Sequence, residues 1–245
     1  RHSVSAQGDA DGSVYIDTFV VLAKKLTTKT FQIKVLLFSK DGTAVPSVRN
    51  VAVAYSNAVP AKAPAVSTGN TSLGETFLAV PECSQMVYPD GGNVWCSPTS
   101  TSMVLGYWGD TGPCEPRVRA AVDGVFDWKY DGHGNWPFNT AYAGTYGLQS
   151  SVRRFGSMNE IEYWVAQGVP VALSYAWNKG ELTGAAVSSS AGHLSVVVGF
   201  DGAGNPIVND PAAAADEDVQ RTYLRSELEP LWLENSGGVV YLIKE

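Results

Sequence analysis

The stretch "NVWCSPTSTSMVLGYWG" (residues 93–109) places a cysteine two residues ahead of a proline and a short apolar run. Proline fits the first turn of a helix, where its missing N–H costs nothing. The stretch therefore predicts a helix over Pro98–Tyr107, with Cys96 at or just before its N-terminus. The partial positive charge of that end favours a thiolate, which is the reactive form of cysteine. Position alone leaves a buried or disulfide-bonded cysteine equally open.

The composition is that of a globular protein with a substantial core. The chain has 245 residues, of which 44% are apolar and 17% are charged, and this argues against disorder or a collagen-like fold. The net charge is −7, without a cluster of Lys and Arg, so we expect no nucleic acid and no anionic membrane as the main partner. A stretch of about 20 apolar residues, as a membrane helix needs, is also missing from the sequence.

The three cysteines are Cys83, Cys96 and Cys114. Their spacing does not match the paired cysteines of structural zinc sites, so we expect neither a metal ion nor a cofactor. Cys83 and Cys114 could form a disulfide in an oxidising compartment, but spacing cannot decide this. The many glycines and few basic residues lean towards a secreted protein. Since the sequence begins at Arg1 without a signal peptide, we expect a processed or trimmed chain.

The pattern of residues divides the chain into three parts. Residues 1–57 are β-rich, with strands predicted in "SVYIDTFVVL", "TFQIKVLLFS" and "SVRNVAVAYS". A sheet this small needs a partner to bury its face, which suggests part of a truncated accessory β-domain. Residues 58–76 are rich in Pro, Ala, Ser and Gly, as is typical of a linker. Residues 77–245 form the third part.

The third part combines early helices with late antiparallel strands, which predicts an α+β fold. Beside the helix after Cys96, we expect helices over Pro116–Val125 and Asn159–Gln167, and a short one in "RSELEPLWLE". Ser157 with Glu160, and Ser226 with Glu229, stand in capping-box positions. The segment 132–147, "GHGNWPFNTAYAGTYG", is interpreted as a long loop that either lines a substrate cleft or is a surface loop.

A nucleophilic cysteine needs a base, and His193 is the best candidate among the three histidines. It opens the apolar strand "GHLSVVVGFD", where a titratable ring needs a polar partner. Asp210 in "PIVNDP" follows across an inferred hairpin. Asn209 and Asp210 point to opposite faces of that strand, and we choose Asp210 as the residue that orients His193. The alternatives are a hydrogen-bonded histidine at a strand end and an aspartate that caps a turn.

An acyl-transfer site also needs a donor for the oxyanion. Gln85 precedes Cys96 by 11 residues, and the intervening "PDGGN" could loop out and return its side chain to the cysteine. The Gln85 amide and the Cys96 backbone N–H would then form the oxyanion hole. This signal is weak alone, because glutamines are usually just solvated.

Together, "SQMVYPDGGNVWCSPTSTSMVLGYWG", "GHLSVVVGFDGAGNPIVNDPAA" and "SGGVVYLI" resemble the bacterial double-glycine-peptidase-like cysteine peptidases of the papain-like superfamily. The resemblance covers about residues 77–245 and implies a papain-like fold. It implies Cys96 as nucleophile, His193 as general base and acid, Asp210 as orienting residue and Gln85 as oxyanion donor. The sequence departs from the family in Ser97, where glycine is usual, and in the longer spacing between Gln85 and Cys96.

The predicted function is therefore that of a cysteine hydrolase, and most of all a peptidase acting on a peptide or protein substrate. A monomer is compatible with the sequence. Two alternatives stay open: a papain-like binding module without turnover, and an acyltransferase of the transglutaminase type. The substrate cannot be read from the sequence.

Overall fold

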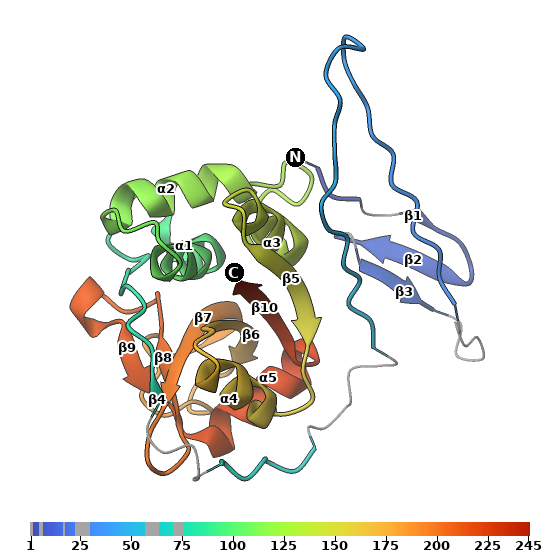
Figure 1. Ribbon diagram of the computed structural model, residues 1–245. Helices are drawn as coiled ribbons and strands as arrows, with labels where there is room; N and C mark the ends of the chain where they lie inside the picture. Colours follow the sequence, from blue (N-terminus) through green and yellow to red (C-terminus); the bar gives the residue numbers. More distant parts are fainter. Residues whose placement is uncertain (1, 5–6, 17, 23–29, 57–63, 71–75) are drawn as a thin grey trace.

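The computed structural model describes residues 2–4, 7–16, 18–22, 30–56, 64–70 and 76–245. From Thr76 onwards the chain builds an α+β domain around one antiparallel sheet (Figure 1). Its helices are α1 (Cys96–Tyr107), α2 (Cys114–Val125), α3 (Trp136–Gly144), α4 (Met158–Ala166) and α5 (Arg225–Ser236). Its strands are β4 (Thr76–Phe77), β5 (Gln149–Arg154), β6 (Val171–Trp177), β7 (Ser190–Phe200), β8 (Pro206–Asn209), β9 (Gln220–Thr222) and β10 (Val239–Lys244).

The strand order is β5-β10-β6-β7-β8-β9, and β4 pairs with β7 outside this path. Helices cover both faces of the sheet. On one face, Ala172, Val196 and Ile243 pack in the same apolar cluster as residues of α1, α2 and α3. On the other face, Leu173 and Val197 pack with residues of α4 and α5. Neighbouring residues of a strand thus enter opposite cores, as the alternation of a strand requires.

Helix α1 is buried almost throughout, from Ser97 to Gly106, so it lies inside the domain rather than on its surface. Its polar side chains bond inside the core: Ser100 Oγ donates to the Leu194 carbonyl, and Thr101 Oγ1 donates to Asn139. A buried polar group costs free energy unless it is hydrogen-bonded. These bonds therefore fix how α1 lies on β7.

The predicted helices are present, with bounds within two residues of those expected. Ser157 caps α4 by accepting from the Asn159 N–H, as predicted. Glu160 accepts from the Gly156 N–H, one residue ahead of the cap itself. The prediction of Ser226 as a cap is wrong, because α5 begins at Arg225 and has no side-chain cap.

The interpretation of residues 132–147 as a long loop is also wrong, because α3 occupies most of this segment. Asn135 caps α3 by accepting from the Phe138 N–H, and Pro137 lies in the first turn. Both residues are ordinary start signals of a helix. The surrounding glycines and aromatic residues concealed them in the sequence.

The N-terminal part contains β1 (Gln7–Gly8), β2 (Gly12–Tyr15) and β3 (Thr18–Val21), which form a small antiparallel sheet. The run "SVYIDTFVVL" was expected to be one strand, but the chain turns at Ile16, whose φ is 46°, and gives a hairpin. Residues 30–39 and 47–56 were also expected to be strands. They are extended but carry no strand pairing (Figure 1).

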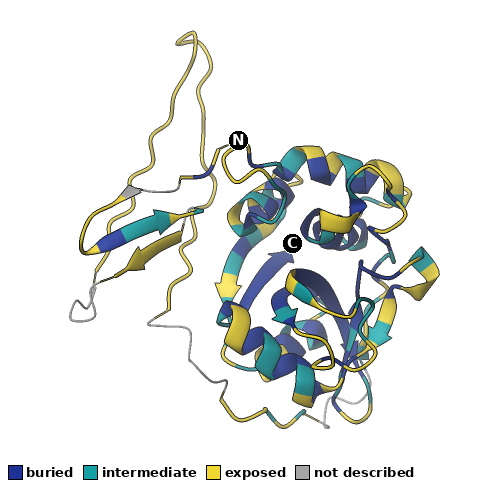
Figure 2. Ribbon diagram, turned by 180° about the vertical axis from the view of Figure 1, so that it is seen from behind, coloured by how far each residue is buried: buried dark blue, intermediate teal, exposed yellow. Residues whose placement is uncertain are grey.

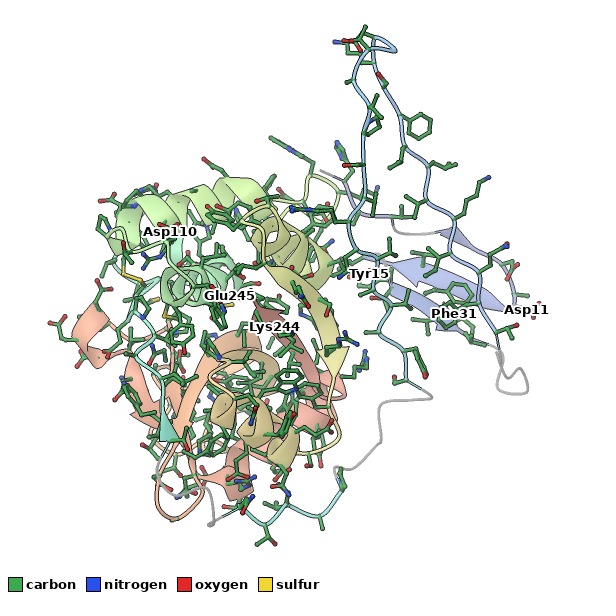
Figure 3. All side chains as sticks on the ribbon, viewed as in Figure 1. Asp11, Tyr15, Phe31, Asp110, Lys244 and Glu245 are labelled. Atoms are coloured by element: carbon green, nitrogen blue, oxygen red, sulfur yellow. A yellow bond between two sulfur atoms is a disulfide. The ribbon has the colours of Figure 1, made fainter. Side chains whose placement is uncertain are left out.

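Most large apolar side chains of the N-terminal part are exposed, including Tyr15 and Phe31, which are labelled in Figure 3. Contacts with the rest of the chain are few. The Ser3 N–H donates to buried Asp127 at 2.9 Å, and the Arg49 guanidinium donates to the Gly144 carbonyl at 3.4 Å. The division of the chain at residues 57 and 76 stays a prediction.

The expected linker is tied to the domain where it is described, at residues 64–70. The Ser67 N–H and hydroxyl both donate to Glu229, and the Asn70 N–H donates to Glu162. Both carboxylates are buried beside the Arg225 guanidinium, 3.1 Å from Glu162 and 3.9 Å from Glu229. The segment therefore lies against a buried group of charges.

Cys83 and Cys114 form a disulfide, with their Cα atoms 5.6 Å apart. The bond joins the segment ahead of α1 to the first residue of α2. Cys96 is the free cysteine, so the pairing leaves the candidate nucleophile as a thiol.

Candidate active site

Cys96 is the first residue of α1, as the sequence predicts, and it is partly exposed. The next residue, Ser97, is buried and its hydroxyl lies 2.8 Å from the hydroxyl of Tyr241 on β10. This contact explains how a serine is accommodated where the similar peptidases usually have glycine. The start of α1 is thereby bonded to the central sheet.

His193 lies on β7, directly opposite Tyr175 of β6 in the strand register. The imidazole is 3% exposed, and its ring packs edge-on against Tyr175 and Trp177, at centroid distances of 5.5 and 5.4 Å. The two aromatic rings also stack on each other. This packing holds the imidazole in one place and shields it from water.

The Nε2 atom of His193 lies 2.7 Å from Oδ1 of Asp210. The Cys96 thiol is also within hydrogen-bonding contact of the ring, and Nδ1 is the nitrogen left for it. Burial by itself would lower the pKa of His193. The charge and hydrogen bond of Asp210, with the contribution of Cys96, outweigh burial and raise this pKa to about 10. The site therefore favours an imidazolium.

Asp210 is fully buried, and both its oxygens are hydrogen-bonded. Oδ1 also accepts from the Ala212 N–H at 2.9 Å, and Oδ2 accepts from the Tyr223 hydroxyl at 2.6 Å. Burial alone would raise the pKa of Asp210, but the positive charge of His193 and these hydrogen bonds lower it below its usual range. Asp210 is thus an ionised carboxylate.

Asn209 and Asp210 point to different partners, in agreement with the alternation of a strand. The Asn209 amide donates to the backbone carbonyls of Val80 and Pro81, at 3.1 and 3.3 Å, and not to His193. The choice of the aspartate as the partner of His193 agrees with this geometry.

Gln85 is buried, at 3% exposed, and its side-chain Nε2 donates to the Gly92 carbonyl at 2.6 Å. The chain between them closes on itself, since the Tyr88 N–H donates to the Gln85 carbonyl and the Gly92 N–H donates to the Tyr88 carbonyl. A Cβ on Gly92 would collide with the Gln85 carbonyl, so only glycine permits this approach.

This closed loop absorbs the long spacing between Gln85 and the cysteine. It returns the glutamine amide to Gly92, four residues ahead of Cys96. The Gln85 backbone N–H also donates to the carbonyl of Pro211, the neighbour of Asp210. Gln85 therefore bridges the cysteine loop and the aspartate loop. An amide NH₂ carries two protons, so the bond to Gly92 leaves one for another acceptor.

Three residues of the site were not found from the sequence: Tyr175, Trp177 and Tyr223. A signal for the first two was present, because they alternate in "VALSYAW" on a strand that could pair with that of His193. Tyr223 left no such signal. It meets Asp210 only because β9 pairs with β8 and brings Tyr223 back beside it.

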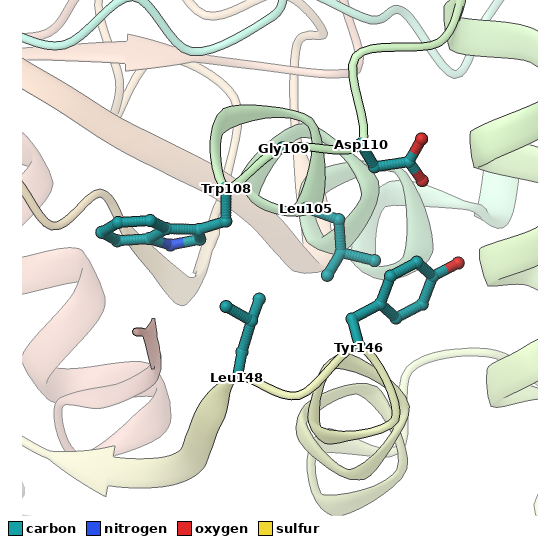
Figure 4. Close-up of a pocket in the computed structure, with 6 residues that line it drawn as sticks. All are labelled: Leu105, Trp108, Gly109, Asp110, Tyr146 and Leu148. Carbon is teal, nitrogen blue, oxygen red and sulfur yellow. The ribbon is translucent and has the colours of Figure 1, made fainter.

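A cavity of about 250 Å³ opens at the other end of α1, lined by Leu105, Trp108, Gly109, Asp110, Tyr146 and Leu148 (Figure 4). Because α1 has 12 residues, this cavity lies about 18 Å along the helix from Cys96. It is separate from the cluster around His193.

In the part of the chain that the structure describes, no three His, Cys, Asp or Glu side chains are placed to share a metal ion. Within the same residues, none of the helices has the length and apolar character needed to cross a bilayer.

Comparison with known proteins adds three findings. Residues 77–240, well over half of the chain, match the Peptidase C39-like family, and residues 1–56 match the Peptidase C39 N-terminal domain. A crystal structure described as a C39-like peptidase from Bacillus anthracis is similar in fold, with a TM-score of 0.51. The match has 19% sequence identity and covers 70% of this chain and 98% of the other. No curated protein matches the sequence.

The family match and the similar fold agree with the helix-borne cysteine and the buried His–Asp pair. The chain belongs to the Peptidase C39-like family, a family of cysteine peptidases.

Proposed function

We propose that the protein hydrolyses peptide bonds with Cys96 as nucleophile, His193 as general base and acid, and Asp210 as the residue that orients His193. The observation that carries this proposal is the buried His193, hydrogen-bonded to Asp210 at 2.7 Å and in contact with the free thiol at the start of α1. A nucleophile, a base and an orienting group in this order are the arrangement of covalent acyl transfer.

In the first step, the Cys96 thiolate attacks the carbonyl carbon of the scissile bond. The carbonyl becomes an oxyanion, which we propose is held by the Cys96 backbone N–H and the second amide proton of Gln85. His193 gives its proton to the leaving amine, and a thioester with Cys96 remains.

In the second step, His193 takes a proton from water, and the resulting hydroxide attacks the thioester. The acid product leaves, and the sulfur and the imidazole return to their starting states. Asp210 stays ionised throughout and stabilises the imidazolium. The low pKa of Asp210 and the high pKa of His193 support these roles.

The test is digestion of an unbiased peptide library, read by mass spectrometry, with the Cys96→Ala protein as control. We expect new termini only with the intact cysteine, and loss of cleavage in His193→Ala. Identical profiles for the intact and Cys96→Ala proteins would contradict the proposal and favour a binding module. Amine adducts of peptides without cleavage would instead indicate an acyltransferase.

We also propose that the protein acts outside the cytoplasm. The disulfide between Cys83 and Cys114 supports this, because disulfides persist in oxidising compartments. Fractionation of the producing cells, with an antibody against the protein, should find it in the medium or the cell envelope. Recovery from the cytosolic fraction alone would contradict secretion.

A further inference from the structure

We propose that Tyr223 is a positioning residue of the active site, which fixes the Asp210 carboxylate so that its other oxygen faces His193. This inference rests on the proposed function, because it assigns Tyr223 a part in the same site. Tyr223 touches neither Cys96 nor the place where substrate would react, so it acts through Asp210.

The first support is the position of Tyr223 in the fold. It follows β9 directly, and β9 pairs with β8, the strand that leads to Asp210. The Tyr223 N–H donates to the Pro206 carbonyl at 3.1 Å, and its side chain is fully buried. Backbone and ring are therefore both held, and the hydroxyl is presented at a fixed point.

The second support is the way in which the bonds to the carboxylate are divided. Oδ1 of Asp210 is shared by His193 and the Ala212 N–H, at 2.7 and 2.9 Å, and Oδ2 accepts from Tyr223 at 2.6 Å. Donors on both oxygens set the plane of the carboxylate. Without the hydroxyl, a fully buried anionic oxygen would lose the donor that the structure gives it.

The third support is the direction of the Tyr223 proton. The backbone N–H of Ala186 donates to the phenol oxygen, so the single phenol proton is directed to Asp210. Burial, and then the charge of Asp210, raise the pKa of Tyr223 far above its usual value. The hydroxyl therefore stays a donor at every pH at which the protein is folded.

The test compares Tyr223→Phe with the intact protein in two assays. The first is peptide cleavage, where we expect kcat to fall about ten- to a hundredfold with KM unchanged, the weight of one charged hydrogen bond. The second is alkylation of Cys96 by iodoacetamide as a function of pH, where we expect about tenfold slower labelling at mildly acidic pH. Tyr107→Phe is the matched control, since it removes a phenol bond to the Gly168 carbonyl away from the site.

A double-mutant cycle separates positioning from general stability. In the Asp210→Ala background, Tyr223→Phe should no longer change either rate, because the acceptor is gone. If Asp210→Ala does not fold, Asp210→Asn serves, and the effect should shrink. Thermal unfolding of each variant checks that it is folded.

Intact rates in folded Tyr223→Phe, a loss no larger than in Tyr107→Phe, or an undiminished effect in the Asp210 background would each overturn the proposal. The alkylation assay needs no substrate. If no peptide is cleaved by the intact protein, the proposed function fails while the role of Tyr223 is still tested.

Discussion

The N-terminal part and the peptidase domain have similar strand-like sequences but very different structures. "FQIKVLLFS" and "VALSYAW" both consist largely of β-branched, aromatic and other apolar residues. The second forms β6, which is buried between β7 and β10. The first is an exposed extended segment, with Phe38 at 82% exposed. Figure 2 shows the contrast between an exposed N-terminal part and a buried sheet.

The difference teaches that a strand pattern describes what a segment can do and not what it does. A strand needs a neighbour for its N–H and C=O groups and a layer to cover its apolar face. β6 has two neighbours, and helices lie on both faces of the sheet. Residues 30–56 have neither, and their apolar side chains are left in water.

The largest expected effect compares a carboxylate from each region. Asp210→Ala should lower kcat about 10⁴-fold, because the imidazole loses its tautomer control and its counter-charge. Asp41→Ala removes an exposed carboxylate that accepts from the Thr43 N–H in the N-terminal part, and should leave kcat unchanged. Peptide-cleavage assays on both proteins measure this. Equal losses would mean that the N-terminal part takes part in the chemistry.

The next effect concerns Gln85. Gln85→Ala should lower kcat by about 10²–10³ if its amide stabilises the oxyanion. Gln32→Ala, in the exposed extended segment, is the matched control with no expected change. A loss below about fivefold in Gln85→Ala, with folding intact, would remove Gln85 from the oxyanion hole.

The packing contrast is measured by one leucine from each region. Leu173 on β6 is fully buried, and Leu173→Ala should lower the free energy of unfolding by about 2–5 kcal/mol. Leu36 is 60% exposed, and Leu36→Ala should change it by less than about 0.5 kcal/mol. Urea unfolding of the two variants gives both values. A large effect at Leu36 would show that residues 30–39 are covered in solution.

The smallest effect is a change of stability with pH. The pKa of His193 is raised from 6.5 to about 10, so its charged form contributes stability that is fully present below pH 6.5. This contribution is lost as pH rises towards 10. The urea midpoint should therefore fall over that range in the intact protein, and less steeply in His193→Gln. His2→Gln, at an exposed position of the N-terminal part, should keep the original slope.

Much of the candidate site follows from local chemistry. The proline after Cys96 and the apolar run behind it predict a helix with the cysteine at its start, and α1 begins at Cys96. The polar ring ahead of a buried strand calls for a partner, and His193 has one in Asp210. The roles of Cys96, His193, Asp210 and Gln85 in a reaction stay a prediction.

What the sequence by itself determined is the set of local features: where α1, α2 and α4 lie, which strand carries His193, and which residue types face the core. These depend on neighbours within a few residues, through capping, proline geometry and side-chain alternation. Only the tertiary structure decided that Tyr223 meets Asp210, that Gln85 returns to Gly92, and that residues 30–39 stay unpaired. These features depend on strand register, loop closure and the presence of a partner, which arise when distant segments pack together and which no local pattern encodes.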